Sequence, residues 1–185
     1  QDLDRYLEVF KRLQAEQKMD ELQNRMQQLL EQQESLNQEM AQLNESSDQS
    51  TLNRLAQEEQ RNLDELKNIE SLLEQASELV EPFSESTSQK LMELMESDIM
   101  EGAETRMNDV SQNLIDQNIQ SAQSASQESL ENMEMMMQQI MEMKQQFQQE
   151  TVSDMTENFQ GLMQDMLYLS AQEEQLQMDV KKASR

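Results

Sequence analysis

Histidine and cysteine are both absent from the 185 residues of this chain. Without imidazole or thiol groups, it cannot form Ser-His or Cys-His nucleophile pairs, imidazole or thiolate metal sites, or the histidine-containing di-iron site of helical bundles. Its two glycines, Gly102 and Gly161, are too few for a phosphate-binding loop. Most enzyme classes are therefore excluded, and we expect a protein that is not an enzyme and binds no cofactor.

Helix-breaking and aromatic residues are almost as rare, with one proline, two glycines and 3% aromatics. The abundant Gln, Glu, Leu and Met favour helices. A hydrophobic content of 35% is low for a compact globule but sufficient for helices that touch along a narrow stripe. Disorder is the alternative for so polar a chain, but regular apolar spacing argues against it. We predict an all-α fold: an elongated antiparallel helical bundle or coiled coil of about five helices.

Basic residues are scarce as well, since 14 Lys and Arg against 38 Asp and Glu give a net charge of -24. This charge repels phosphate backbones, so we expect no nucleic-acid partner. Between residues 68 and 143 the only bases are Lys90 and Arg106. That acidic stretch is either a solvated face or a docking surface for a basic partner. No run approaches the roughly 18 apolar residues of a membrane span, so we expect no direct membrane insertion of this segment.

An apolar seam with heptad spacing begins at Ala15. Its members alternate steps of three and four residues, with Gln33 at the one polar position: Ala15, Met19, Leu22, Met26, Leu29, Leu36, Met40 and Leu43. This spacing predicts a helix that packs along one face. An earlier stripe in a different phase comprises Leu3, Tyr6, Phe10 and Leu13. A stutter or a change of packing partner would explain the shift of phase.

A second helix is expected to follow a turn at residues 44–50 and to end before Pro82, which gives an antiparallel hairpin. The first helix would exceed the second by about 20 Å, so part of it needs another partner. We expect residues 1–81 to form an N-terminal helical hairpin and residues 82–185 a C-terminal Met-rich helical bundle, with one continuous domain as the alternative. Gln33 and Glu59 interrupt the two seams, and they either pair across the hairpin and fix its register or lie at exposed edges.

The C-terminal part is predicted to contain three further helices. After a connector at residues 83–88, a stripe from Leu91 to Leu114 predicts one helix, which Gly102 weakens by about 1 kcal/mol without necessarily breaking it. A turn is expected at residues 116–118, with Asn118 in the left-handed conformation. Two helices should follow, divided near residue 150, with one continuous rod as the alternative.

Methionine is the most distinctive residue type, with 17 copies, and it is densest between residues 133 and 143. We predict that one helical face carries the candidate partner-binding residues Met133, Met136, Met137, Ile140 and Met141, with Met135 and Met143 lying off it. A flexible core seam is the first interpretation, because methionine fills irregular gaps. An adaptable groove for a partner helix and thioether coordination of Cu(I) are the others.

Three glutamine-rich stretches, Met26 to Asn37, Leu55 to Gln60 and Met107 to Leu130, resemble the soluble helical region of a family of large bacterial inner-membrane proteins of uncharacterised function. The resemblance implies a periplasmic extension of a membrane-anchored protein, and it supplies no catalytic residues. The chain begins at Gln1 rather than methionine, and we expect it to be a piece of a longer protein.

These features together favour a structural or scaffolding helical module that mediates self-association or binds a protein partner. The alternative is an adaptor or chaperone-like module that takes up an amphipathic client through the methionine-rich face. A signalling coiled-coil rod is a third hypothesis, for which the sequence offers no distinctive motif.

Overall fold

The computed structural model describes the backbone of residues 2–183 and the side chains of residues 6–152. Within this range it has five helices and no strand, so the all-α prediction is confirmed. The helices are α1 (Asp2–Met40), α2 (Gln49–Val80), α3 (Glu85–Met95), α4 (Asp98–Ile115) and α5 (Ile119–Ala183). The last two expected helices are thus one continuous helix. The chain divides into two units, Gln1–Phe147 and Gln148–Arg185, and α5 begins in the first.

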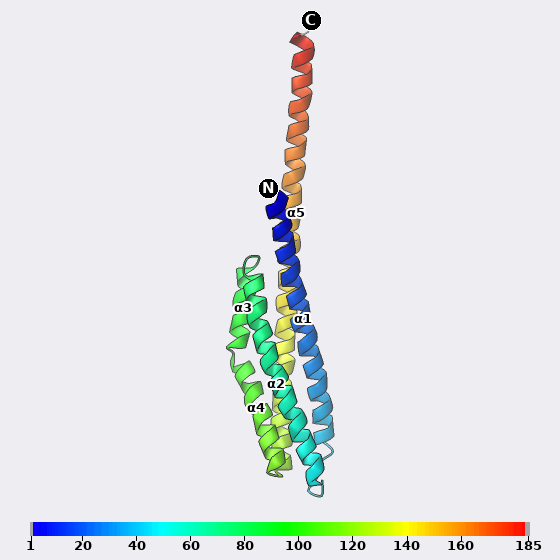
Figure 1. Cartoon of the computed structure of the whole chain (residues 1–185), viewed down its shortest axis with the longest axis vertical. Coiled ribbons are helices and arrows are strands. Elements are labelled where there is room, and N and C mark those ends of the chain that lie inside the picture. Colours follow the sequence, from blue (N-terminus) through cyan, green and yellow to red (C-terminus); the bar gives the residue numbers. More distant parts are fainter. Residues whose placement is uncertain (1, 184–185) are drawn as a thin grey trace. The chain divides into compact units, whose positions relative to one another are not determined.

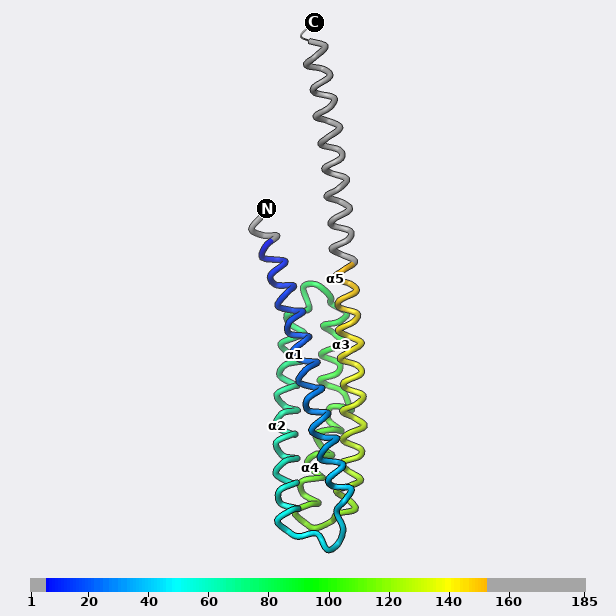
Figure 2. The backbone as a smooth tube through the Cα atoms, turned by 90° about the vertical axis from the view of Figure 1, so that its right-hand side faces the viewer, coloured from blue at the N-terminus to red at the C-terminus, as the bar shows by residue number. Residues whose placement is uncertain are grey.

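The first unit is an antiparallel helical bundle (Figures 1 and 2). Helix α2 packs against α1 on one side and against α3 and α4, which follow each other along its length, on the other. The part of α5 in this unit runs antiparallel to α1. At one end of that pair Gln123 donates to the Met40 carbonyl at 2.7 Å, and at the other Lys144 forms a 2.5 Å ion pair with Asp20.

Residues 82–147 share their core with the N-terminal hairpin. One buried cluster combines side chains of all five helices, including Leu22 of α1, Leu66 of α2 and Ile140 of α5. The sequence placed a boundary at residue 82, whereas the contacts divide the chain after Phe147. The reason is that α3 and α4 fold back onto α2 and complete its core.

Short polar side chains set the beginnings of α2 and α3. Asp48 caps α2 by accepting a hydrogen bond from the Thr51 amide at 2.7 Å. Ser84 caps α3 in the same way through the Thr87 amide at 3.1 Å. Helix α2 ends at Val80, just before Pro82, as expected.

The stripe from Leu91 to Leu114 is divided between two helices, contrary to the expectation of a single one. Ser97 donates to the Leu94 carbonyl at 2.6 Å and accepts from the Met100 amide, and so closes α3 and caps α4. Gly102 instead lies within α4. A Cβ at Gly102 would come within 2.9 Å of the Asn132 side-chain nitrogen, so glycine here permits a close approach of α4 and α5.

The turn between α4 and α5 lies at the expected place, but Gln117 rather than Asn118 adopts the left-handed conformation, with φ of 62°. The Asn118 amide donates to the Asn113 carbonyl at 2.7 Å, and the Gln117 amide donates to the Leu114 carbonyl. This double closure is a Schellman motif, which requires the left-handed residue directly after the C-cap, here Asp116.

Candidate functional site

The methionine-rich segment of α5 lies mostly inside the bundle. Met133, Met136, Met137 and Ile140 are buried, and of the five predicted partner-binding residues only Met141 is exposed, at 49%. The four buried residues belong to the core that all five helices share. They therefore pack the bundle and do not form an accessible face.

The phase of this segment differs from the predicted one at two positions. Met143 is buried, although it was placed off the face, and Met141 is exposed, although it was placed on it. Met143 follows Ile140 by three residues and precedes the buried Phe147 by four, which is the spacing of an inward seam. Met141 is turned about 100° from Ile140 and leaves that seam.

Met141 contributes to a shallow groove between α1 and α5. Leu30 and Met137 are its other apolar lining residues, and Glu34, Glu134 and Glu142 are its acidic ones. Because Leu30 and Met137 are themselves buried, this groove offers little apolar surface besides Met141. Acidic side chains surround it, which disfavours an acidic partner.

A buried polar layer crosses the hairpin where the two apolar seams are interrupted. Gln33 donates from its amide nitrogen to both carboxyl oxygens of Glu59, at 3.1 and 2.9 Å, and Asn62 donates to the Gln33 amide oxygen at 2.9 Å. Of the two interpretations of Gln33 and Glu59, pairing across the hairpin is confirmed. The layer separates two apolar clusters, one ending at Leu30 and Leu63 and the other beginning at Leu36 and Ala56.

Burial raises the pKa of Glu59 to about 7, and its hydrogen bond from Gln33 opposes this by favouring the ionised form. The side chain is fully buried, and no cation among the described side chains pairs with it. Because burial disfavours the carboxylate more than the Gln33 amide stabilises it, the carboxyl group is protonated more readily than an exposed one. The layer is therefore a pH-dependent element of the hairpin.

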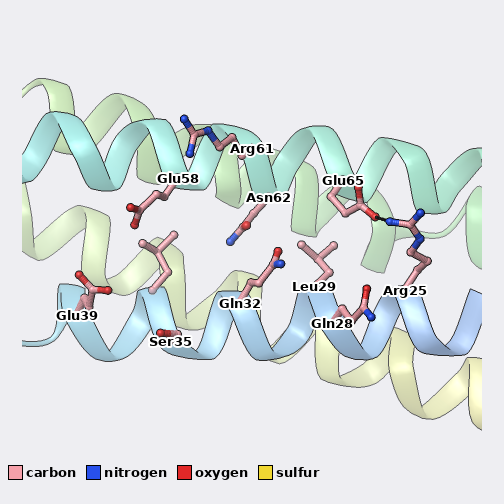
Figure 3. Close-up of a pocket in the computed structure, with 11 residues that line it drawn as sticks. Arg25, Gln28, Leu29, Gln32, Ser35, Glu39, Glu58, Arg61, Asn62 and Glu65 are labelled. Atoms are coloured by element: carbon pink, nitrogen blue, oxygen red, sulfur yellow. Dashed lines mark hydrogen bonds and ion pairs between the residues drawn. The ribbon is translucent and has the colours of Figure 1, made fainter.

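A groove of about 470 Å³ lies over this layer, between α1 and α2 (Figure 3). Asn62 lines it from α2, and two other lining residues, Arg25 of α1 and Glu65 of α2, form an ion pair across the hairpin at 3.2 Å. Arg54 donates hydrogen bonds to Glu39 of α1 and to Glu58 of its own helix, and these bonds, the one to Glu39 first, raise the pKa of Arg54. Two ion pairs at this groove, Arg25 with Glu65 and Glu39 with Arg54, thus join α1 to α2.

The first turns of α1 carry large apolar side chains that are exposed. We call this set the α1 apolar face: Tyr6, Leu7, Val9, Phe10 and Leu13, each at least 48% exposed, with Tyr6 at 73%. Five such residues within eight positions of one helix are more than the scattered apolar residues of an ordinary surface. Leu3, which belongs to the same stripe, lies outside the described side chains.

The α1 apolar face points away from the bundle core. At about 100° per residue, Tyr6, Phe10 and Leu13 lie within about 60° of one another, and Ala15 lies about 180° from Tyr6. Ala15 and Met19 are fully buried. The change of phase seen in the sequence is therefore a reversal of direction, and the bundle cannot cover this face with the core that covers the rest of α1.

No protein-family model, curated protein or solved structure matches this chain. The resemblance of its glutamine-rich stretches to bacterial inner-membrane proteins therefore stays a prediction.

The described part of the chain shows no helix long and apolar enough to cross a membrane. Its described side chains also include no cluster of three or more acidic residues positioned to hold a metal ion.

Sequence reasoning missed three residues of these features. Leu7 and Val9 broaden the α1 apolar face beyond the stripe that was recognised. Helical spacing could have revealed this, because Leu7 lies three residues before Phe10 and Val9 lies four residues before Leu13. Asn62 completes the buried layer with Gln33. Its place three residues after Glu59, on the same helical face, was the available signal.

Proposed function

We propose that this chain is a non-catalytic structural or scaffolding module that mediates self-association or binds a protein partner through the α1 apolar face. The observation that carries this proposal is the outward direction of Tyr6, Phe10 and Leu13 on a helix whose apolar seam from Ala15 to Met40 is buried. Exposing such a face costs free energy in water, and covering it with another protein recovers about 25 cal/mol per Å². An apolar patch of this kind typically marks an interaction surface.

The rest of the bundle supports this assignment. Its apolar seams are filled by its own helices, and the main residues of its methionine-rich segment are in the core. The adaptor or chaperone-like alternative needed an exposed methionine-rich face, and Met133, Met136 and Met137 do not provide one. The α1 apolar face is therefore the better candidate for partner binding.

Photocross-linking in cells tests this function. A photoreactive benzoylphenylalanine in place of Tyr6 should form a covalent adduct with a protein, either a second copy or a different chain. The same group in place of Met135, which is also exposed but lies on α5, is the matched control and should give much less adduct. The proposal fails if position 6 captures no more protein than position 135.

A further inference from the structure

The α1 apolar face lies on the part of α1 that extends past the neighbouring helices of the first unit. Arg12 lies over the Phe83 ring, 5.2 Å from its centroid, and Phe83 belongs to the connector between α2 and α3. The residues of α1 that precede Arg12 therefore continue beyond the ends of these two helices, as Figure 1 shows. Short helical overhangs are marginal in water, so an additional packing partner would stabilise these turns.

Charge distinguishes this segment from the rest of the chain. Residues 1–13 contain three acidic and three basic residues, so their net charge is zero, whereas the whole chain carries -24. Two copies of so acidic a protein repel each other over most of their surfaces. Their mutual repulsion is weakest where the local charge is balanced. The α1 apolar face is thus a surface on which two copies can approach at a low electrostatic cost.

The area is also sufficient for a weak dimer. Each of the five exposed side chains offers on the order of 100 Å², so two copies would bury on the order of 1,000 Å² in total. That is near the lower limit of a specific interface. A two-fold arrangement uses the same patch on both copies, so one apolar face suffices for both.

We propose that the occupant of the α1 apolar face is a second copy of this chain, paired through the same face in a two-fold dimer. This inference rests on the proposed function and names its partner. Apolar burial holds the dimer together, and the acidic charge elsewhere opposes it. Added salt therefore strengthens the association, because it screens the repulsion between copies.

Sedimentation velocity on the purified chain tests this pairing. The mass should rise from the 21.7 kDa of one chain toward twice that value as the concentration passes through the micromolar range. The double variant Tyr6→Ser/Phe10→Ser should weaken dimerisation at least tenfold. The control Met135→Ser/Met141→Ser removes two exposed methionines of α5 and should leave it unchanged. Far-UV circular dichroism verifies that both variants keep their helices.

The absence of cysteine permits a second, independent measurement. A single cysteine introduced as Val9→Cys should form a disulfide-linked dimer on mild oxidation, because the two-fold arrangement brings the faces of both copies together. Met135→Cys should not. A dimer that persists in the Tyr6→Ser/Phe10→Ser variant overturns the assignment of the interface to this face.

The remaining outcomes separate this inference from the function on which it rests. If the chain stays monomeric at all concentrations but position 6 cross-links to a protein of another mass in cells, the second copy is excluded and the binding function stands. If the chain is monomeric and position 6 captures no protein, the dimer and the proposed binding function are both excluded. A monomer that pellets with phosphatidylcholine vesicles, and does so only with Phe10 intact, would assign the face to a lipid surface and overturn the dimer.

Discussion

The methionine-rich segment of α5 and the first turns of α1 are both dense in apolar residues, but the first segment is mostly buried and the second is exposed. Met133, Met136 and Ile140 are fully buried, whereas Tyr6 and Phe10 are mostly exposed. The sequence drew attention to the methionines, because they are unusual in number. The exposed face uses ordinary residue types and is less conspicuous.

The difference teaches that helical phase, and not apolar density, decides which segment faces a partner. Met133, Met136, Met137 and Met143 point inward from α5 and pack in the core that α1, α2, α3 and α4 share. Tyr6, Phe10 and Leu13 point about 140° to 180° away from Ala15, which begins the inward seam of the same helix. A change of phase within one helix is therefore a stronger signal of a second surface than a run of unusual residues.

The largest change in stability is expected in the methionine-rich segment, where two adjacent methionines differ in burial. Met136→Ala should lower the free energy of unfolding by about 2 to 5 kcal/mol, since it leaves a cavity in a fully buried position. Met135→Ala removes an exposed side chain from the next position and should change it by at most about 0.5 kcal/mol. Urea unfolding followed by circular dichroism measures both. If both variants lost the same free energy of unfolding, helical phase would not determine which of the two methionines is buried.

The second prediction concerns the buried polar layer of Gln33, Glu59 and Asn62 between α1 and α2. The pKa of Glu59 is raised from 4.5 to about 7, so the folded state binds more protons than the unfolded state between these values. Its contribution to stability is present below pH 4.5 and is lost as the pH rises through 7. At 1.36 kcal/mol per pKa unit, ionising Glu59 costs about 3 kcal/mol at pH 8.

Glu59→Gln removes this cost while keeping an oxygen that accepts from Gln33. We expect the variant to be more stable than the original chain by up to about 3 kcal/mol at pH 8 and nearly equal to it at pH 4.5. Urea unfolding across this range measures the difference. A constant difference between Glu59→Gln and the original chain would show that Glu59 does not titrate in this window.

The general architecture could be predicted because heptad spacing and rare breakers dictate long packed helices. The hairpin turn before Thr51 followed from the presence of a capping aspartate. The end of α2 before Pro82 followed from the restriction that proline imposes on the preceding residue. The pairing of Gln33 with Glu59 followed from their seam positions. It remained one of two interpretations, because sequence alone does not show which seams face each other.

Other details depended on competition between local signals. Ser97 could cap a new helix or remain within one, and only the packing of α3 and α4 along α2 selects the break. Gln117 adopts the left-handed conformation because the Schellman hydrogen bonds fix its place, although asparagine has the stronger intrinsic preference. The sequence prediction placed Met141 on the shared apolar face and Met143 off it, the reverse of what the structure shows. The reason is that several faces of a methionine-dense helix are equally apolar.

The third prediction tests the close approach of α4 and α5. Gly102→Ala gains about 1 kcal/mol of helix propensity but moves the flexible Asn132 amide, from which its Cβ would be 2.9 Å away. We expect a net stabilisation of less than about 1 kcal/mol in thermal or urea unfolding. In an Asn132→Ala background the gain should be larger, since the obstructing group is absent. Equal gains in both backgrounds would show that Asn132 does not restrict this position.

The smallest effect is expected at Phe10, and a second phenylalanine provides its reference. Phe147 is 1% exposed in the core, so Phe147→Ala should cost about 3 to 5 kcal/mol. Phe10 is 58% exposed, so Phe10→Ala should change the stability of a dilute, monomeric sample by at most about 0.5 kcal/mol. Its effect should grow with protein concentration, because a dimer stabilises the original chain by mass action and the variant loses that gain. A large, concentration-independent loss at Phe10 would instead mean that this side chain is packed within one chain, and the contrast between the two segments would disappear.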